Sequence, residues 1–238
     1  MPARNKLLLH ITGMLQGAKP DWEQMVAKFR RTPMYKEENY NLSNLAGKLE
    51  EIWLQVTLED ICSPFGDRVV FDPIRNGTLE GNYVFKHYDD GLKAVDRLNG
   101  SIYSEIDNLL LIDKMPTLFE IKIKRYDGGP KRATRKPSYA SIKYFMREEM
   151  INYLLEPLKE YFQTEECGYV LIASADQILK KSPLQQRFER EGGILVPFYT
   201  DRYSYRKEVM EIALSYGLLG HLSGRAIIKR HTERAIHL

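Results

Sequence analysis

The feature that most constrains this fold is a pair of apolar segments, residues 105–113 and 117–125, joined by a tight link at residues 114–116. Each segment has the length of one strand, and so short a link favours an antiparallel hairpin. Side chains alternate along a strand, so Glu120 and Lys122 share one face and the isoleucines beside them face the other way. The hairpin therefore carries charged groups on one face of an otherwise apolar strand.

Helical and strand-like patterns precede the hairpin. Apolar residues recur at helical spacing in segments 21–31 and 44–60, and Asn41 or Ser43 can cap the second helix. The sequence then predicts two short strands and a short helix before the hairpin, at residues 69–71, 83–85 and 89–98.

Further helices and strands alternate after the hairpin. A long helix is expected over about residues 138–162, kinked or broken before Pro157. Another helix has Ser182 as N-cap, Pro183 at its first position and Gln185 completing a capping box. The remaining predicted elements are strands at 169–175 and 194–199 and a last helix at about 205–218.

This order predicts an α/β protein with a mixed central sheet flanked by helices. We expect three regions: an N-terminal helical extension (1–43), a core (44–200), and a C-terminal helix with a basic tail (201–238). The length of 238 residues suits one such core with extensions and lets the chain bury most of its apolar surface.

Composition narrows the classes of function. The chain is 43% hydrophobic and 28% charged, as in ordinary globular proteins, and its net charge of +3 is too small to indicate nucleic-acid binding by itself. Cys62 and Cys167 lie far apart without a CxxC pair, which excludes a disulfide scaffold and a cysteine zinc knuckle and suits a reducing compartment.

The apolar runs are too short to cross a bilayer, and polar residues interrupt the first 17 residues too often for a signal peptide. We therefore expect a cytoplasmic protein with no membrane partner. The chain also has no GxxxxGK[ST] or strand-linked GxGxxG motif, which disfavours nucleotide hydrolysis and dinucleotide chemistry.

The hairpin carries the candidate chemistry. Asp107 lies at the start of its first strand, so antiparallel pairing brings it near Glu120 and Lys122. Two converging carboxylates suit Mg²⁺ or Mn²⁺, and a neighbouring lysine can orient or deprotonate a water and stabilise a charged transition state. This set predicts phosphodiester hydrolysis. The alternative is that both acids are solvated edge residues with Lys122 as their ion-pair partner, and Glu105 is a reserve ligand.

The order of these parts, over roughly residues 44–200, resembles the PD-(D/E)XK nuclease superfamily of restriction enzymes, Holliday-junction resolvases and repair nucleases. The resemblance implies a restriction-endonuclease-like fold, with extra N- and C-terminal helices here. It also implies a metal-site glutamate on the first core helix, which nominates Glu50 or Glu51. Position 106 is isoleucine where the family often has proline, and residues 65–100 look like a strand plus an insertion.

Basic residues cluster directly after the proposed site and suit contacts with backbone phosphates, which would make binding sensitive to salt. A solvated flexible loop explains the same charges. The predicted nucleic-acid contacts are Lys124, Arg125, Lys131, Arg132, Arg135 and Lys136.

Together these features predict a Mg²⁺-dependent DNA endonuclease of the restriction, repair or resolvase type. A homodimer is expected, because cutting both strands is simplest with two sites. The alternative is a catalytically inactive nuclease-like module that binds a protein partner in transcription or repair. An RNA-processing nuclease remains open, since the chemistry of the site is shared.

Overall fold

Two sheets organise the computed structural model, which describes residues 2–36, 40–75, 81–88, 91–106, 108–123, 142–178 and 182–218. The larger sheet is mixed, with strand order β1-β5-β6-β7-β8, and the smaller is antiparallel, with order β2-β3-β4. The strands are β1 (Val69–Phe71), β2 (Tyr83–Tyr88), β3 (Gly91–Asp96), β4 (Ile102–Ile106), β5 (Asn108–Ile112), β6 (Met115–Lys122), β7 (Gly168–Ala173) and β8 (Ile194–Pro197).

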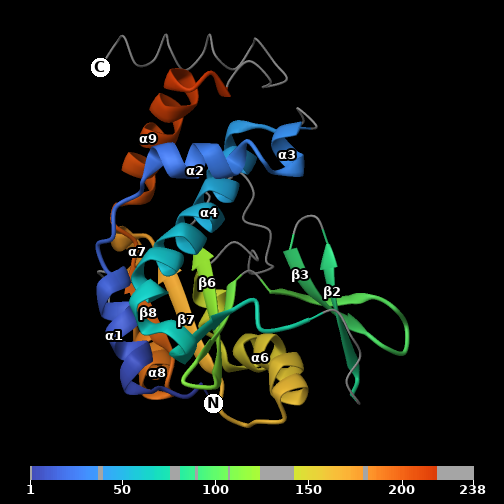
Figure 1. Ribbon diagram of the computed structural model, residues 1–238. Helices are drawn as coiled ribbons and strands as arrows, with labels where there is room; N and C mark the ends of the chain where they lie inside the picture. Colours follow the sequence, from blue (N-terminus) through green and yellow to red (C-terminus); the bar gives the residue numbers. More distant parts are fainter. Residues whose placement is uncertain are drawn as a thin grey trace, which may run out of the picture.

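Helices flank the larger sheet on both faces (Figure 1). The α-helices are α1 (Lys6–Leu15), α2 (Trp22–Phe29), α3 (Pro33–Lys36), α4 (Leu42–Cys62), α5 (Ile142–Phe145), α6 (Glu148–Phe162), α7 (Ala175–Ile178), α8 (Pro183–Arg190) and α9 (Arg202–Ser215), with a 3₁₀ turn η1 (Ser63–Arg68). The predicted α/β class with a mixed sheet flanked by helices is confirmed. No helix in the described ranges has the length and apolar character needed to cross a membrane.

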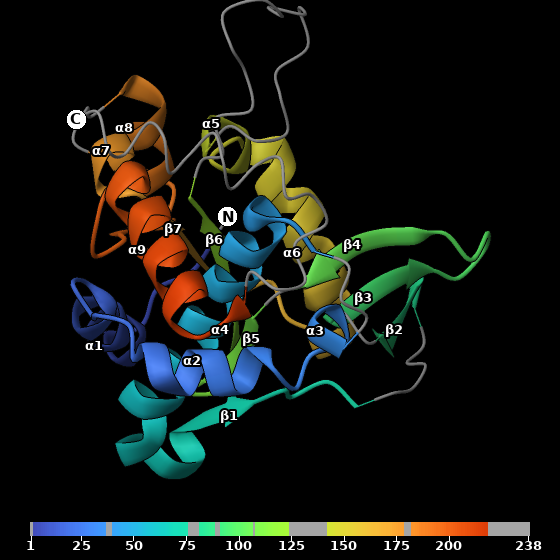
Figure 2. The same cartoon turned by 90° about the horizontal axis from the view of Figure 1, so that it is seen from above.

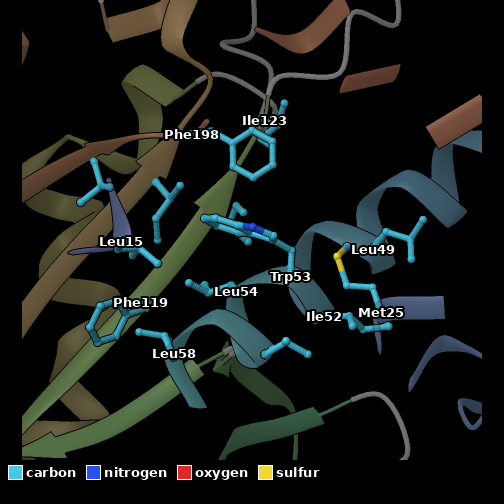
Figure 3. Close-up of a cluster of buried hydrophobic side chains, with 14 of the residues drawn as sticks. Leu15, Met25, Leu49, Ile52, Trp53, Leu54, Leu58, Phe119, Ile123 and Phe198 are labelled. Carbon is cyan, nitrogen blue, oxygen red and sulfur yellow. The ribbon is translucent and has the colours of Figure 1, made fainter. Parts of the chain in front are cut away.

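The larger sheet separates two hydrophobic cores. The first core lies under α1, α2, α4 and α9, and Trp53 and Leu54 of α4 point toward Phe119 and Ile123 on the β6 side (Figure 3). The second core lies under α5, α6 and α8 and contains Leu118 and Leu171 from the other face of the sheet. Helices α1 and α2, from the predicted N-terminal extension, thus share a core with α4 and the sheet.

The smaller sheet stands beside the larger one (Figure 2). It packs on α6, because Phe85, Ala94 and Ile106 belong to the second core together with Leu154 and Leu158. The chain reaches this sheet after β1 and returns from it into β5. The smaller sheet is therefore inserted between two neighbouring strands of the larger one.

The predicted hairpin is confirmed as β5 and β6, which pair antiparallel from Ile112 opposite Met115 to Asn108 opposite Phe119. Its turn lies one position earlier than expected. Asp113 and Lys114 have φ values of 50° and 67°, as in a two-residue hairpin turn, so residues 115 and 116 belong to β6. The turn is held by Arg68, whose Nε and Nη2 donate to the Asp113 carboxylate at 2.8 and 2.9 Å.

The predicted starts of two helices are confirmed. Asn41 caps α4, its side chain accepting from the Asn44 backbone N–H at 2.9 Å, and Ser182 caps α8 by accepting from Gln185 N at 3.2 Å. The Gln185 side-chain amide donates to Glu189 at 3.4 Å, along the helix rather than back to its start.

Two predicted elements are wrong. Residues 91–96 form strand β3, which pairs with both β2 and β4, where a short helix was expected. The break in the long helix falls between α5 and α6, and α6 then continues through Pro157. Pro157 lacks the N–H that would bond to the carbonyl of Tyr153, so α6 loses one backbone hydrogen bond there without being broken.

Strands β6 and β7 pack closely at Gly168, which is paired with Thr117. A Cβ atom there would lie 2.6 Å from Thr117 Oγ1 and 2.7 Å from Thr117 Cγ2. We expect Gly168→Ala to lower the free energy of unfolding by about 1–3 kcal/mol through overpacking. Gly13→Ala is the control, because a Cβ in that part of α1 meets nothing within 4 Å. It should stabilise the chain by roughly 0.5–1 kcal/mol, since alanine favours a helix more than glycine does. Urea unfolding of both variants measures the difference, and equal stabilities would contradict this packing.

Candidate metal centre

Strand β6 presents the candidate pair Glu120 and Lys122 on the second-core face of the larger sheet. Phe119, Ile121 and Ile123 belong to the first core, so the alternation expected from the sequence places the two charged residues opposite them. The two side chains form an ion pair, with 2.6 Å between Lys122 Nζ and Glu120 Oε1.

Glu120 is a buried carboxylate, with a relative exposure of 5%, whereas the Lys122 side chain is one-third exposed. The Lys122 ammonium also lies 5.0 Å from the centroid of the Phe145 ring in α5. A buried carboxylate loses hydration and needs compensating charge or hydrogen bonds. Lys122 supplies that charge, and the Phe145 ring attracts the same ammonium as a cation–π contact.

Asp107, the other expected carboxylate, lies outside the described residues. The chain on either side of it is described: β4 ends at Ile106 and β5 begins at Asn108. Asn108 is paired with Phe119, the residue before Glu120. Asn108, at the start of β5, is thus adjacent to the part of β6 that carries Glu120.

The two helix glutamates lie on α4, which covers the first-core face of the sheet. Glu50 is buried, and Glu51 pairs with Lys48 at 2.8 Å. Glu120 and Lys122 lie on the opposite face, so these groups can share a site only at the end of the sheet, where β6 stops at Lys122. Within the described ranges, no three His, Cys, Asp or Glu side chains gather as a metal cage would require.

A polar cleft lies between α4, the start of β5 and the smaller sheet, and neither Glu120 nor Lys122 lines it. Its volume is ≈ 350 Å³, and its walls come from α2, α4, the end of β1, the smaller sheet and β5. Glu51 lines the cleft together with Ile106 and Asn108, the two residues that flank Asp107. No local pattern in the sequence predicts this cleft, because its lining residues are spread along the chain from Lys28 to Leu110.

Several other expectations fall outside the described residues, among them all six basic residues predicted to contact nucleic acid: Lys124, Arg125, Lys131, Arg132, Arg135 and Lys136. Two histidines have structural contacts. The His10 ring packs edge-on against Phe65, and His87 Nε2 lies 3.1 Å from the Ile74 carbonyl oxygen.

Comparisons with protein-family models, with curated proteins and with solved structures each find no match to this chain.

Both cysteines are buried thiols outside any disulfide. Burial raises the pKa of Cys62 to about 11 and that of Cys167 to about 12. At pH 8 the thiolate fraction of Cys62 is therefore on the order of one in a thousand, and that of Cys167 is smaller still. We expect a chromogenic disulfide reagent to modify the native chain slowly at pH 8 and two thiols at once in denaturant. Rapid modification of the native chain would contradict this burial.

Proposed function

We propose that this chain is a divalent-metal-dependent nuclease of the PD-(D/E)XK type, cutting phosphodiester bonds in DNA. The observation that carries the proposal is the buried Glu120 carboxylate, held 2.6 Å from a partly exposed lysine two residues further along a central strand. An ion pair of only structural value is more often found at a surface, where the carboxylate keeps its hydration and no desolvation cost arises.

The topology supports the same proposal. Helix α4 precedes β1, β5 and β6, which pair antiparallel; α5 and α6 then cross over to β7, which lies parallel to β6. This is the order of parts on which the resemblance rests. In such a sheet, functional groups gather where strands end, and Lys122 is the last residue of β6.

The donor chemistry fits a hard cation, because carboxylate oxygens are the ligands that Mg²⁺ and Mn²⁺ prefer. Asp107 and Glu120 would hold the ion, and Glu51 or Glu50 would assist from α4. Glu51 is the better placed of the two, because it lines the cleft beside Asn108. A bound Mg²⁺ would supply a more acidic water and stabilise charge on the phosphate.

Lys122 has two roles in this scheme. Its ammonium pairs with Glu120, and in the proposed reaction it would donate a hydrogen bond to the attacking water or to a phosphate oxygen. Contact with Phe145 restricts the directions that its side chain can take. Homodimer formation and phosphate contacts by the basic segment after β6 belong to the same proposal.

Cleavage of plasmid and branched DNA with Mg²⁺ or Mn²⁺ tests the proposal. Lys122→Ala and Glu120→Gln should each lower the cleavage rate by about 100-fold or more, because each removes a group that acts in the transition state. The matched controls are Lys207→Ala and Glu211→Gln, which alter an exposed pair on α9 with 3.9 Å between its charged atoms. Absence of cleavage by the unaltered chain, or full activity of Lys122→Ala, would reject it.

Calorimetric titration with Mn²⁺ separates metal binding from catalysis. We expect the unaltered chain to bind the ion, and Glu120→Gln to weaken that binding strongly while Glu211→Gln leaves it unchanged. An unaltered chain that binds no Mn²⁺ would instead favour the protein-binding module, in which the Glu120–Lys122 pair only stabilises the fold.

A further inference from the structure

Three tyrosine rings meet where the smaller sheet packs on α6 (Figure 2). The ring centroids of Tyr83 in β2 and Tyr103 in β4 lie 4.6 Å apart. Tyr103 in turn stacks on Tyr153 of α6, with 4.4 Å between centroids and an interplanar angle of 30°. Tyr153 is 36% exposed, and the other two side chains are half-buried. Part of this aromatic cluster therefore faces solvent.

Helix α6 carries a row of carboxylates beside these rings. Glu156 follows Tyr153 by three residues and Glu160 follows Glu156 by four, so the three side chains share one face of the helix. The opposite face, with Leu154 and Leu158, is buried in the second core. The solvent side of α6 is thus aromatic and acidic.

Neutral groups hold these carboxylates in place. The Tyr103 hydroxyl donates to Glu156 Oε2 at 3.1 Å, and the backbone N–H and side-chain amide of Asn82 donate to Glu160. A neutral donor fixes the position of a carboxylate without cancelling its charge. In the part of the chain that the structure describes, no lysine or arginine forms an ion pair with Glu156 or Glu160. Both carboxylates therefore keep a negative charge.

An open hollow of ≈ 460 Å³ extends this face toward the end of α6. Three glutamates and one lysine give its lining a net charge of −2, and the lysine, Lys159, pairs with Glu165 at 3.2 Å. Asp96 and Arg97, at the nearby end of β3, together add no net charge. The lining residues are Glu156, Lys159, Glu160, Gln163, Thr164 and Glu165.

We name the three tyrosines and this hollow the α6 surface. Its negative charge differs in sign from the net charge of +3 of the whole chain. Its rings are also open to a cation: among the described residues, the lysine and arginine groups that lie over aromatic rings do so at Tyr88, Phe145 and Tyr203.

Tyrosine faces and carboxylates together suit a guanidinium group. A cation over a tyrosine ring is attracted by the π electrons, and the planar fork of arginine matches a carboxylate with two hydrogen bonds. The phosphates of a nucleic acid would instead be repelled by the carboxylates. Charge complementarity therefore favours a basic protein segment as the ligand of this surface.

From these observations we propose that the α6 surface binds an arginine-containing peptide segment of a partner protein. One guanidinium would lie over Tyr153, and others would pair with Glu156 and Glu160. The inference goes beyond the proposed nuclease activity, because the α6 surface uses neither Glu120 nor Lys122.

Fluorescence anisotropy with labelled nona-arginine, nona-lysine and nona-glutamate peptides tests the proposal. We expect nona-arginine to bind about threefold or more tightly than nona-lysine, because only arginine combines stacking with a two-pronged hydrogen bond to a carboxylate. Nona-glutamate should not bind the α6 surface. The positive net charge of the chain disfavours attraction of a polycation by the molecule as a whole.

Glu156→Gln keeps an oxygen that can accept from Tyr103 and removes only the charge. It should weaken nona-arginine binding by about 2- to 10-fold. Tyr153→Ala should weaken it by about 2- to 30-fold, the range of a cation–π contact, while Tyr153→Phe keeps most of it. Glu211→Gln and Tyr203→Ala are the matched controls on α9, away from the α6 surface, and should leave binding unchanged.

Equal binding of nona-arginine by Glu156→Gln and the unaltered chain would overturn the proposal, even if Tyr153→Ala fails to fold. Equal binding of nona-lysine and nona-arginine would overturn it as well. The plasmid cleavage assay is independent of both results, because Glu156→Gln should cut DNA as the unaltered chain does. A failure of the peptide proposal is thus distinguishable from a failure of the nuclease proposal.

Discussion

The structure depends on a constraint at β6, which must belong to two hydrophobic cores at once. Its odd-numbered residues, such as Phe119 and Ile121, pack under α4, and Leu118 packs under α6. A strand buried on both faces tolerates a charge only where the sheet ends. Glu120 and Lys122 occupy that position, and the ammonium of Lys122 lets the carboxylate stay buried. The candidate chemistry and the stability of the central strand are therefore tied to the same two residues.

Features set by neighbouring residues could be predicted from the sequence. Asn41 and Ser182 cap their helices because a short polar side chain before an apolar run satisfies the first backbone N–H groups. The β5–β6 hairpin and the facing of Glu120 likewise follow from alternation and a two-residue turn. Each depends on contacts within a few positions.

Features set by distant partners could not. Leu92, Val95 and Leu98 have helical spacing, yet residues 91–96 form a strand because β2 and β4 hydrogen-bond to it on both sides. Pro157 is tolerated within α6 because the apolar side of this helix is buried against the second core, and that packing holds the helix together on both sides of the proline. The polar cleft beside α4 is a still clearer case, because its walls come from α2, α4, β1, β5 and the smaller sheet.

The insertion of the smaller sheet between β1 and β5 has an architectural consequence. The larger sheet is completed without it, since β1 pairs directly with β5, so the excursion through β2, β3 and β4 is a module that enters and leaves at neighbouring points. Its length and side chains can diverge in related chains while the central strands keep their register. Changes in the inserted strands β2–β4 would then leave the strands β1, β5 and β6 of the larger sheet in place.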